Sequence, residues 1–233
     1  MMKNPWVIIG GIAVVLIGAS IWYSSYIGEQ ANEGVSFEPH VLGNADSEVV
    51  LVEYSDFECP ACGQFFPVVK DVLEQYGEQI RFEYKHFPLT SIHPYAVPAA
   101  RAAEAAGQQG EFFAMHDLLF ENQSTWANSS NPNTFFTQYA KEIGLDMALF
   151  NQHMKASLIT DKINDEFSAA RAQGFTGTPT FTLNGERMQF QTFEEFVGQI
   201  EAAIGTESAA AEEAMDGHSD ADGSTTDDVE FSL

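Results

Sequence analysis

The chain has 233 residues, a formal net charge of -24 and only ten Lys and Arg residues. The scarcity of basic residues argues against binding to nucleic-acid phosphates and against adhesion to anionic lipid surfaces, because both need clustered positive charge. A hydrophobic content of 45% and 19 Phe residues are enough for a sizeable buried core, so the chain as a whole is not a disordered protein.

An apolar helix is the first predicted element. Residues 5–27 carry no charge and exceed the roughly 20 apolar residues that a membrane-spanning helix needs. Lys3 precedes the run and Glu29 follows it, which predicts that residues 1–4 stay in the cytoplasm. A cleaved signal peptide is the alternative, but its apolar region usually spans only about 7–15 residues. We therefore expect a single-pass signal-anchor in the cell membrane, with the folded domain on the extracytoplasmic side.

Composition divides the remainder of the chain into three parts. Residues 28–35 are polar and predict a short linker, and residues 36–205 predict the folded domain. Residues 206–233 contain no Lys or Arg and are rich in Ala, Ser, Gly and acidic residues. Such a composition predicts an acidic, disordered tail.

The folded region mixes strand and helix patterns. Its predicted elements are a strand at 49–54, a helix at 59–76, a strand at 80–85, several helices between 95 and 173, a hairpin at 179–190 and a helix at 192–204. The Asn184-Gly185 pair marks the hairpin turn. This order of elements is typical of an α/β sandwich with a helical insertion.

Cys59 and Cys62 are the only cysteines, and they flank Pro60 and Ala61 at the start of the first predicted helix of the domain. A disulfide scaffold uses several dispersed cysteines, and a structural zinc site needs about four ligands. A C-x-x-C motif between a strand and a helix instead indicates a redox pair. The alternatives are a metal-ligand pair and an inert structural bridge. We expect no metal and no cofactor other than the redox-active Cys59–Cys62 disulfide.

The two thiols are expected to have different roles. Cys59 falls at the helix N-cap, where unpaired N–H groups and the positive end of the helix stabilise a thiolate. Cys62 lies one turn further along and is more shielded. We therefore predict that Cys59 is the nucleophile and that Cys62 resolves the mixed disulfide.

Glu53 lies inside the apolar strand that precedes the cysteines. A carboxyl buried there would have a raised pKa and, near Cys62, could exchange a proton during catalysis. The alternative is that Glu53 points outward at a strand edge.

Pro179 opens the first strand of the predicted hairpin, a position that a strand tolerates. A cis bond after Thr178 would leave the backbone of Thr178 free to pair with an extended substrate. Only about 5–6% of X–Pro bonds are cis, so the residues alone favour trans.

Several stretches together resemble the DsbA family of thiol-disulfide oxidoreductases in the thioredoxin-like superfamily, particularly its membrane-anchored bacterial branch. They are VEYSDFECPAC at 52–62, KHFPL at 85–89, HP at 93–94, QGEFFAMH at 109–116 and GFTGTPTF at 174–181. The resemblance spans about residues 38–205. It implies a thioredoxin-like fold with a helical insertion at about 95–173, a cis Thr178–Pro179 bond against the disulfide, and Glu53 as the buried acid of the family.

The resemblance also implies an enzyme that donates its disulfide to reduced exported polypeptides, with a membrane quinone-linked thiol oxidase as reoxidant. Pro60, Ala61, Thr178 and Pro179 would then contact the substrate. Ala61 stands where the strongest oxidants of the family have His, so we expect a weaker oxidant. The alternatives are a reductase or isomerase in the same compartment, and a non-catalytic chaperone or binding module.

Overall fold

A five-stranded mixed sheet is the centre of the computed structural model, which describes residues 5–216. In spatial order its strands are β1 (Val41–Gly43), β3 (Arg81–His86), β2 (Val50–Ser55), β4 (Thr180–Leu183) and β5 (Glu186–Arg187). β2 and β3 are parallel, and the other neighbours are antiparallel. The predicted class, a thioredoxin-like α/β fold behind one N-terminal apolar helix, is confirmed.

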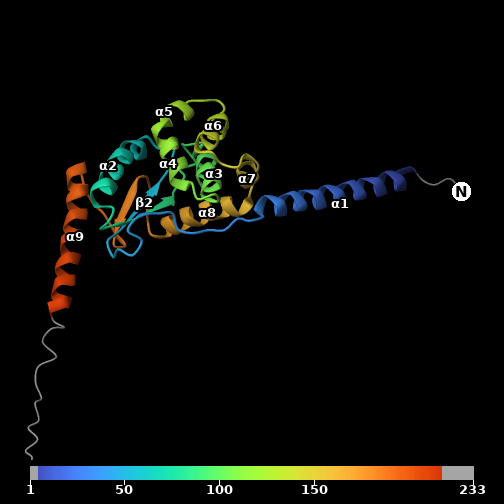
Figure 1. Cartoon of the computed structure of the whole chain (residues 1–233). Helices are drawn as coiled ribbons and strands as arrows, with labels where there is room; N and C mark the ends of the chain where they lie inside the picture. Colours follow the sequence, from blue (N-terminus) through green and yellow to red (C-terminus); the bar gives the residue numbers. More distant parts are fainter. Residues whose placement is uncertain (1–4, 217–233) are drawn as a thin grey trace, which may run out of the picture.

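Helices surround the sheet and extend the chain at both ends (Figure 1). They are α1 (Pro5–Asn32), α2 (Pro60–Tyr76), α3 (Ala96–Gly107), α4 (Phe112–Glu121), α5 (Gln123–Trp126), α6 (Asn133–Ile143), α7 (Met147–His153), α8 (Ser157–Ala172) and α9 (Phe193–Asp216). Helices α3 to α8 lie between β3 and β4 in the chain, where the helical insertion was predicted.

The alternation of side chains along β2 places its two faces against different helices. Leu51 belongs to the main core together with Val69 of α2. Tyr54 instead packs in a smaller cluster with Phe167 of α8. Glu53 lies two residues from Leu51 and therefore faces the α2 side, so the strand buries it beneath the helix that begins at the cysteines.

Helix α1 is longer than predicted, because residues 28–32 of the expected linker are helical. No Pro lies between Gly28 and the helix end at Asn32, and the insertion binds that end of the helix. The Gln152 Nε2 of α7 donates to the carbonyl of Gln30 at 2.7 Å, and the Asn32 amide donates to the Ser157 hydroxyl of α8 at 3.0 Å. Five of the eight residues expected to form the linker at 28–35 are therefore helical.

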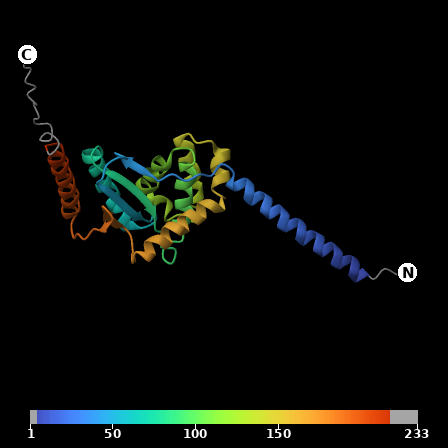
Figure 2. The same ribbon diagram turned by 90° about the horizontal axis from the view of Figure 1, so that it is seen from below.

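In the described part of the chain, one helix is long and apolar enough to cross a membrane. The candidate span is Ile9–Asn32, and its 18-residue apolar window has a mean hydropathy of 1.5 and no residue buried in the protein. A signal sequence meets the same criteria. Figure 2 shows that α1 projects from the side of the insertion, at the opposite end of the domain from α9.

The C-terminal helix also differs from the prediction. Helix α9 continues to Asp216, so residues 206–216, predicted as disordered tail, are helical. Ala, Glu and Met in this stretch are strong helix formers, which explains the extension. Residues 217–233 of the predicted tail lie outside the described residues.

The hairpin has the turn that its sequence requires. Asn184 and Gly185 both have positive φ, 52° and 84°, as a type I′ turn demands. Strand β5 is shorter than predicted, although the Met188 N–H still donates to the Phe181 carbonyl at 3.0 Å. β1 was not predicted, because three residues are too short a run to give a strand pattern.

Candidate active site

Cys59 is the N-cap of α2, and Pro60 occupies the first turn of that helix. The Cys59 backbone is extended (φ -72°, ψ 120°), and the helical conformation begins at the next residue, Pro60. Cys62 follows inside the first turn, and both thiols are free in this structure. Pro60 and Ala61 between them are exposed and open to an incoming chain.

The Cys59 thiol has a pKa lowered from 9.0 to about 5. A hydrogen bond from the Cys62 thiol is the main cause, and burial opposes it. Thr178 and the backbone N–H groups of Cys62 and Ala61 lower the pKa further. Cys59 is therefore a thiolate at neutral pH.

Cys62 has the opposite character. Its side chain is fully buried, and burial raises its pKa well above the usual value. The bond to Cys59 and the charges of Cys59 and Glu53 raise it further. This asymmetry is what a nucleophile at Cys59 and a resolving thiol at Cys62 require.

Glu53 is buried beneath this pair, with 2% of its surface exposed, and not at an outward-facing strand edge. Burial raises the pKa of Glu53 to about 7. The β2–β3 register places Tyr84 beside it, and Ser55 follows two residues on along the same face. None of Glu53 Oε1, Ser55 Oγ and Tyr84 OH makes a hydrogen bond of normal geometry. The Ser55 hydroxyl is nevertheless close enough to lower the pKa values of Glu53, Tyr84 and Cys62 against the effect of burial.

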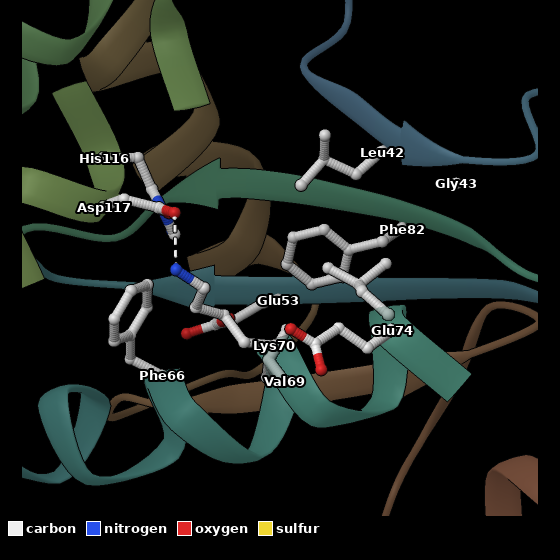
Figure 3. A pocket seen from close by; sticks show the side chains of 11 residues that line it. Leu42, Gly43, Glu53, Phe66, Val69, Lys70, Glu74, Phe82, His116 and Asp117 are labelled. Atoms are coloured by element: carbon white, nitrogen blue, oxygen red, sulfur yellow. Dashed lines mark hydrogen bonds and ion pairs between the residues drawn. The ribbon is translucent and has the colours of Figure 1, made fainter. Parts of the chain in front are cut away.

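A cavity of about 320 Å³ reaches Glu53 between α2, α4 and the sheet (Figure 3). Its apolar wall includes Phe66 and Phe82, and an ion pair between Lys70 Nζ and Asp117 Oδ2, at 2.9 Å, lines it as well. A space of this size with polar groups on its wall is large enough for several water molecules. The carboxyl of Glu53 therefore borders a space of a size that water can occupy.

His116 also lines this cavity and was missed by the sequence analysis. Burial lowers its pKa, its Nδ1 lies 2.9 Å from Asp117 Oδ1, and its buried Nε2 has no partner. Its place at the end of the QGEFFAMH stretch was noted only as part of the resemblance.

The loop before β4 meets the cysteines from the other side. The Thr178–Pro179 bond is cis, as the resemblance implies. When it is protonated, the Cys59 thiol donates to the Thr178 carbonyl, with Sγ and O 3.6 Å apart. The structure thus brings Cys59, Cys62, Glu53 and Thr178 together from three separate parts of the chain.

Asp56 is a second residue that the sequence analysis missed. It is buried, and its carboxylate accepts the backbone N–H groups of Glu58 and Leu89, both at 2.8 Å. Its Oδ2 also lies 2.7 Å from His93 Nδ1. Asp56 thereby ties the loop after β3 to the turn that carries Cys59. Among the described residues there is no cluster of three or more His, Cys, Asp and Glu suited to a metal ion.

Comparison with known proteins identifies the family. The thioredoxin family model matches residues 36–202. A thioredoxin-like oxidoreductase from Silicibacter pomeroyi DSS-3 is 28% identical, with a TM-score of 0.59 over 71% of this chain and 91% of that chain. Two structures share the fold at lower identity. BdbD from Bacillus subtilis is 19% identical (TM-score 0.63; 74% of this chain and 94% of that one), and alpha-DsbA1 from Wolbachia pipientis is 22% identical (TM-score 0.64; 78% and 99%).

Curated relatives carry a different name. A protein named Na(+)/H(+) antiporter NhaA 3 from Salinispora tropica is 41% identical over 148 residues, which are 64% of this chain and 22% of that protein. A protein named Na(+)/H(+) antiporter NhaA 1 from Mycobacterium sp. (strain KMS) is 37% identical over 152 residues and 24% of its length. The chain thus spans less than a quarter of these relatives, and their name does not transfer to it. The family match, by contrast, covers well over half of the chain, which therefore belongs to the thioredoxin family and shares its fold with BdbD and alpha-DsbA1.

Proposed function

We propose that the chain is an oxidase that introduces disulfides into exported proteins from the extracytoplasmic face of the membrane. The observation that carries this proposal is the low pKa of the Cys59 thiol beside a buried Cys62. A stabilised thiolate stabilises the reduced form of the pair, which makes the disulfide form the stronger oxidant.

The proposed reaction transfers two electrons from a substrate dithiol to the Cys59–Cys62 disulfide. A substrate thiolate attacks Cys59 Sγ, the bond between the two cysteines breaks, and Cys62 leaves and takes up a proton from Glu53. The second substrate thiolate then attacks the substrate sulfur of the mixed disulfide, and Cys59 leaves as a thiolate. The substrate is oxidised to its disulfide, the pair is reduced to the Cys59 thiolate and the Cys62 thiol, and a proton from solvent returns to Glu53 through the cavity.

Geometry supports the remaining roles in this proposal. Pro60 and Ala61 are exposed beside Cys59, and Thr178 and Pro179 lie against it, so an extended substrate would contact all four. The pair needs no other cofactor, since its two sulfurs hold both electrons. We further propose that a membrane quinone-linked thiol oxidase reoxidises the pair, which α1 would hold at the membrane surface.

The decisive experiment is the redox equilibrium of the Cys59/Cys62 pair against glutathione. We expect a potential above the roughly -270 mV of thioredoxin, and Ala61→His should raise it further because a His at this position adds a donor to the thiolate. A potential at or below that of thioredoxin would make the enzyme a reductase.

Two variants test the roles of the cysteines. Cys59→Ser should abolish exchange, whereas Cys62→Ser should accumulate a mixed disulfide through Cys59, because no thiol remains to resolve it. Trapping through Cys62 in the Cys59→Ser protein would reverse the assignment, and a protein active without either thiol would indicate a chaperone or binding module.

Topology is tested separately with protease added to spheroplasts. The domain and the C-terminal segment should be digested in intact spheroplasts, and a protein released from the membrane after processing would instead show that α1 is a cleaved signal. A domain that is cut only after lysis would place it in the cytoplasm and contradict the proposal.

A further inference from the structure

The helical insertion reaches the start of the active-site helix through one side chain, Gln123. This residue opens the short helix α5, and its Nε2 donates to two backbone carbonyls, that of Phe57 at 2.7 Å and that of Cys59 at 2.8 Å. Both carbonyls belong to the turn that presents Cys59. No other described side chain donates to either of them through a hydrogen bond given by the structure.

Helix α5 is firmly held within the insertion. Trp126, three residues after Gln123, is fully buried, and its Nε1 donates to the Leu119 carbonyl of α4 at 2.7 Å. Trp126 also packs its ring against Phe136 of α6, with ring centroids 5.3 Å apart. The backbone of Gln123 is therefore fixed to α4 and α6, and its side chain transmits the position of the insertion to the active site.

Gly63, which follows Cys62, leaves the space that this side chain needs. A Cβ on residue 63 would lie 2.6 Å from Gln123 Oε1 and 3.1 Å from its Cδ, closer than carbon and oxygen tolerate. The φ of Gly63 is not positive, so its backbone does not demand glycine. The Gly63 N–H donates to the Cys59 carbonyl at 3.1 Å, so this oxygen accepts hydrogen bonds from both Gly63 and Gln123.

We propose that Gln123 and Gly63 form a matched pair that positions Cys59 and sets its reactivity from the helical insertion. The proposal rests on Cys59 as the nucleophile of the proposed function. Carbonyl oxygens carry partial negative charge, and two of them lie in the turn that holds the Cys59 thiolate. The Gln123 amide binds both, which fixes the turn and lessens their repulsion of the thiolate.

A double-mutant cycle tests the pair through the thiol pKa of Cys59, read from thiolate absorbance, and through the glutathione equilibrium. Gln123→Ala should raise the thiol pKa and shift the equilibrium by about five- to tenfold toward the disulfide form, because both carbonyls then face the thiolate without the amide that binds them. Gly63→Ala should have an effect of at least that size, because its methyl group displaces the amide. The double variant should be no worse than Gln123→Ala alone, because the methyl group then fills the vacated space.

Two further variants keep the test decisive. Gln123→Glu preserves the size of the side chain but replaces the donor with a carboxylate, so it should raise the thiol pKa more than Gln123→Ala. Gln199→Ala is the control, since its Nε2 also donates to a backbone carbonyl, that of Gln189 at 2.8 Å, but on the exposed surface. It should leave both readouts unchanged.

The outcomes separate this inference from the proposed function. If Cys59→Ser retains exchange, the proposed function fails. If the wild-type thiol behaves as proposed but Gln123→Ala and Gln123→Glu leave its pKa unchanged, or if the effects of Gln123→Ala and Gly63→Ala add, only the pairing fails. Should Gly63→Ala not fold, the two Gln123 variants still decide the question.

Discussion

Two glutamates of this domain are equally buried and have opposite chemistry. Glu53 under the cysteines is 2% exposed and Glu104 in α3 is 0% exposed. Glu53 has no salt-bridge partner among the described residues, and burial raises its pKa to about 7. Burial also favours the neutral form of Glu104, but bonds from His40 and His86 and the charges around it hold its pKa well below the usual value. Partners, and not depth, decide which buried carboxyl can exchange a proton.

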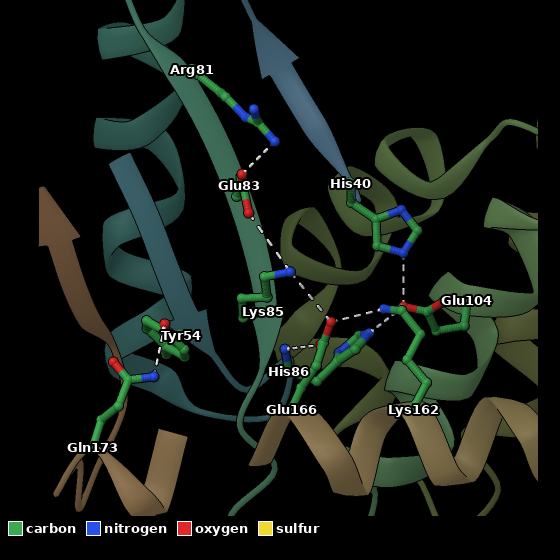
Figure 4. A network of polar contacts seen from close by, with 10 residues as sticks. All are labelled: His40, Tyr54, Arg81, Glu83, Lys85, His86, Glu104, Lys162, Glu166 and Gln173. Atoms are coloured by element: carbon green, nitrogen blue, oxygen red, sulfur yellow. Dashed lines mark hydrogen bonds and ion pairs between the residues drawn. The ribbon is translucent and has the colours of Figure 1, made fainter. Parts of the chain in front are cut away.

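The surroundings of Glu104 are a network that joins the insertion to the sheet (Figure 4). Its Oε1 lies 2.8 Å from a ring nitrogen of His40, 2.8 Å from one of His86 and 2.6 Å from Lys162 Nζ. An ionised carboxylate only accepts hydrogen bonds, so each of these nitrogens donates. Lys162 in turn binds Glu166, which accepts the His86 backbone N–H at 2.8 Å. Glu104 therefore fixes structure, whereas Glu53 remains free to titrate.

Replacing Glu104 should give the largest effect. Glu104→Gln leaves the buried His86 and the half-buried His40 and Lys162 facing a neutral amide, and breaking a buried ion pair costs about 3–5 kcal/mol. Urea denaturation should show a loss of this size in the free energy of unfolding. Glu142→Gln on the exposed surface is the matched control and should change stability by less than about 0.5 kcal/mol. A Glu104 variant as stable as the wild type would show that the network contributes nothing net.

The pH dependence of stability should separate the two carboxyls by sign. Glu53 has a folded pKa raised from 4.5 to about 7, so its contribution is fully present below pH 4.5 and is lost as pH rises to about 7. The loss is about 3 kcal/mol, since one pKa unit corresponds to about 1.4 kcal/mol. Glu104 has a depressed folded pKa, so its contribution is present above the ordinary carboxyl pKa and is lost as pH falls through the folded value.

Denaturation of the reduced protein at several pH values checks this contrast. Relative to the wild type, Glu53→Gln should gain stability steadily between pH 4.5 and pH 7, because the amide does not ionise. Glu104→Gln should show no such gain over the same interval. Parallel curves for Glu53→Gln and the wild type would mean that Glu53 has an ordinary pKa.

The sequence could identify Glu53 but not Glu104, and the reason is physical. Glu53 is the one charged residue in the apolar run at residues 49–54, so the sequence itself shows a carboxyl in a strand that is otherwise expected to be buried. Glu104 lies in an Ala-rich helix, where its sequence pattern is that of a polar residue on an exposed face. Its partners His40 and Lys162 are 64 and 58 residues away in the chain. Only the fold brings such partners together.

The same distinction explains the other results. The N-cap position of Cys59, the Asn184-Gly185 turn and the helical insertion depend on local pattern and were predicted correctly. The contacts of Asp56 and Gln123 depend on the tertiary approach of distant segments, and β1 depends on pairing with β3. The ends of α1 and α9 were misplaced because a polar composition was read as loop where helix formers continue.

Glu53→Gln should also slow catalysis, and this effect should be smaller than the two effects on stability described above. Loss of a general acid or base that serves Cys62 is expected to slow exchange by about a hundredfold, roughly 2.7 kcal/mol. The defect should lie in the step that involves Cys62, so alkylation of Cys59 should be affected much less. Tyr84→Phe is the control on the neighbouring strand, since it removes a buried hydroxyl and keeps the carboxyl. Equal rates for Glu53→Gln and the wild type would show that Cys62 exchanges its proton without Glu53.

Ser55→Ala should give the smallest effect and tests whether Glu53 acts alone. The Ser55 hydroxyl lowers the pKa of Glu53 and that of Cys62 against burial, so its removal should raise both. Because Ser55 Oγ makes no hydrogen bond of normal geometry, the effect should stay below the ~1 kcal/mol of a full hydrogen bond, which predicts a less than about fivefold slower exchange and a pH profile displaced upward. In a Glu53→Gln background the same substitution should change the rate very little, because no proton then passes through the carboxyl. An equal effect in both backgrounds would mean that Ser55 acts on Cys62 directly and that the proton exchange of Glu53 does not depend on Ser55.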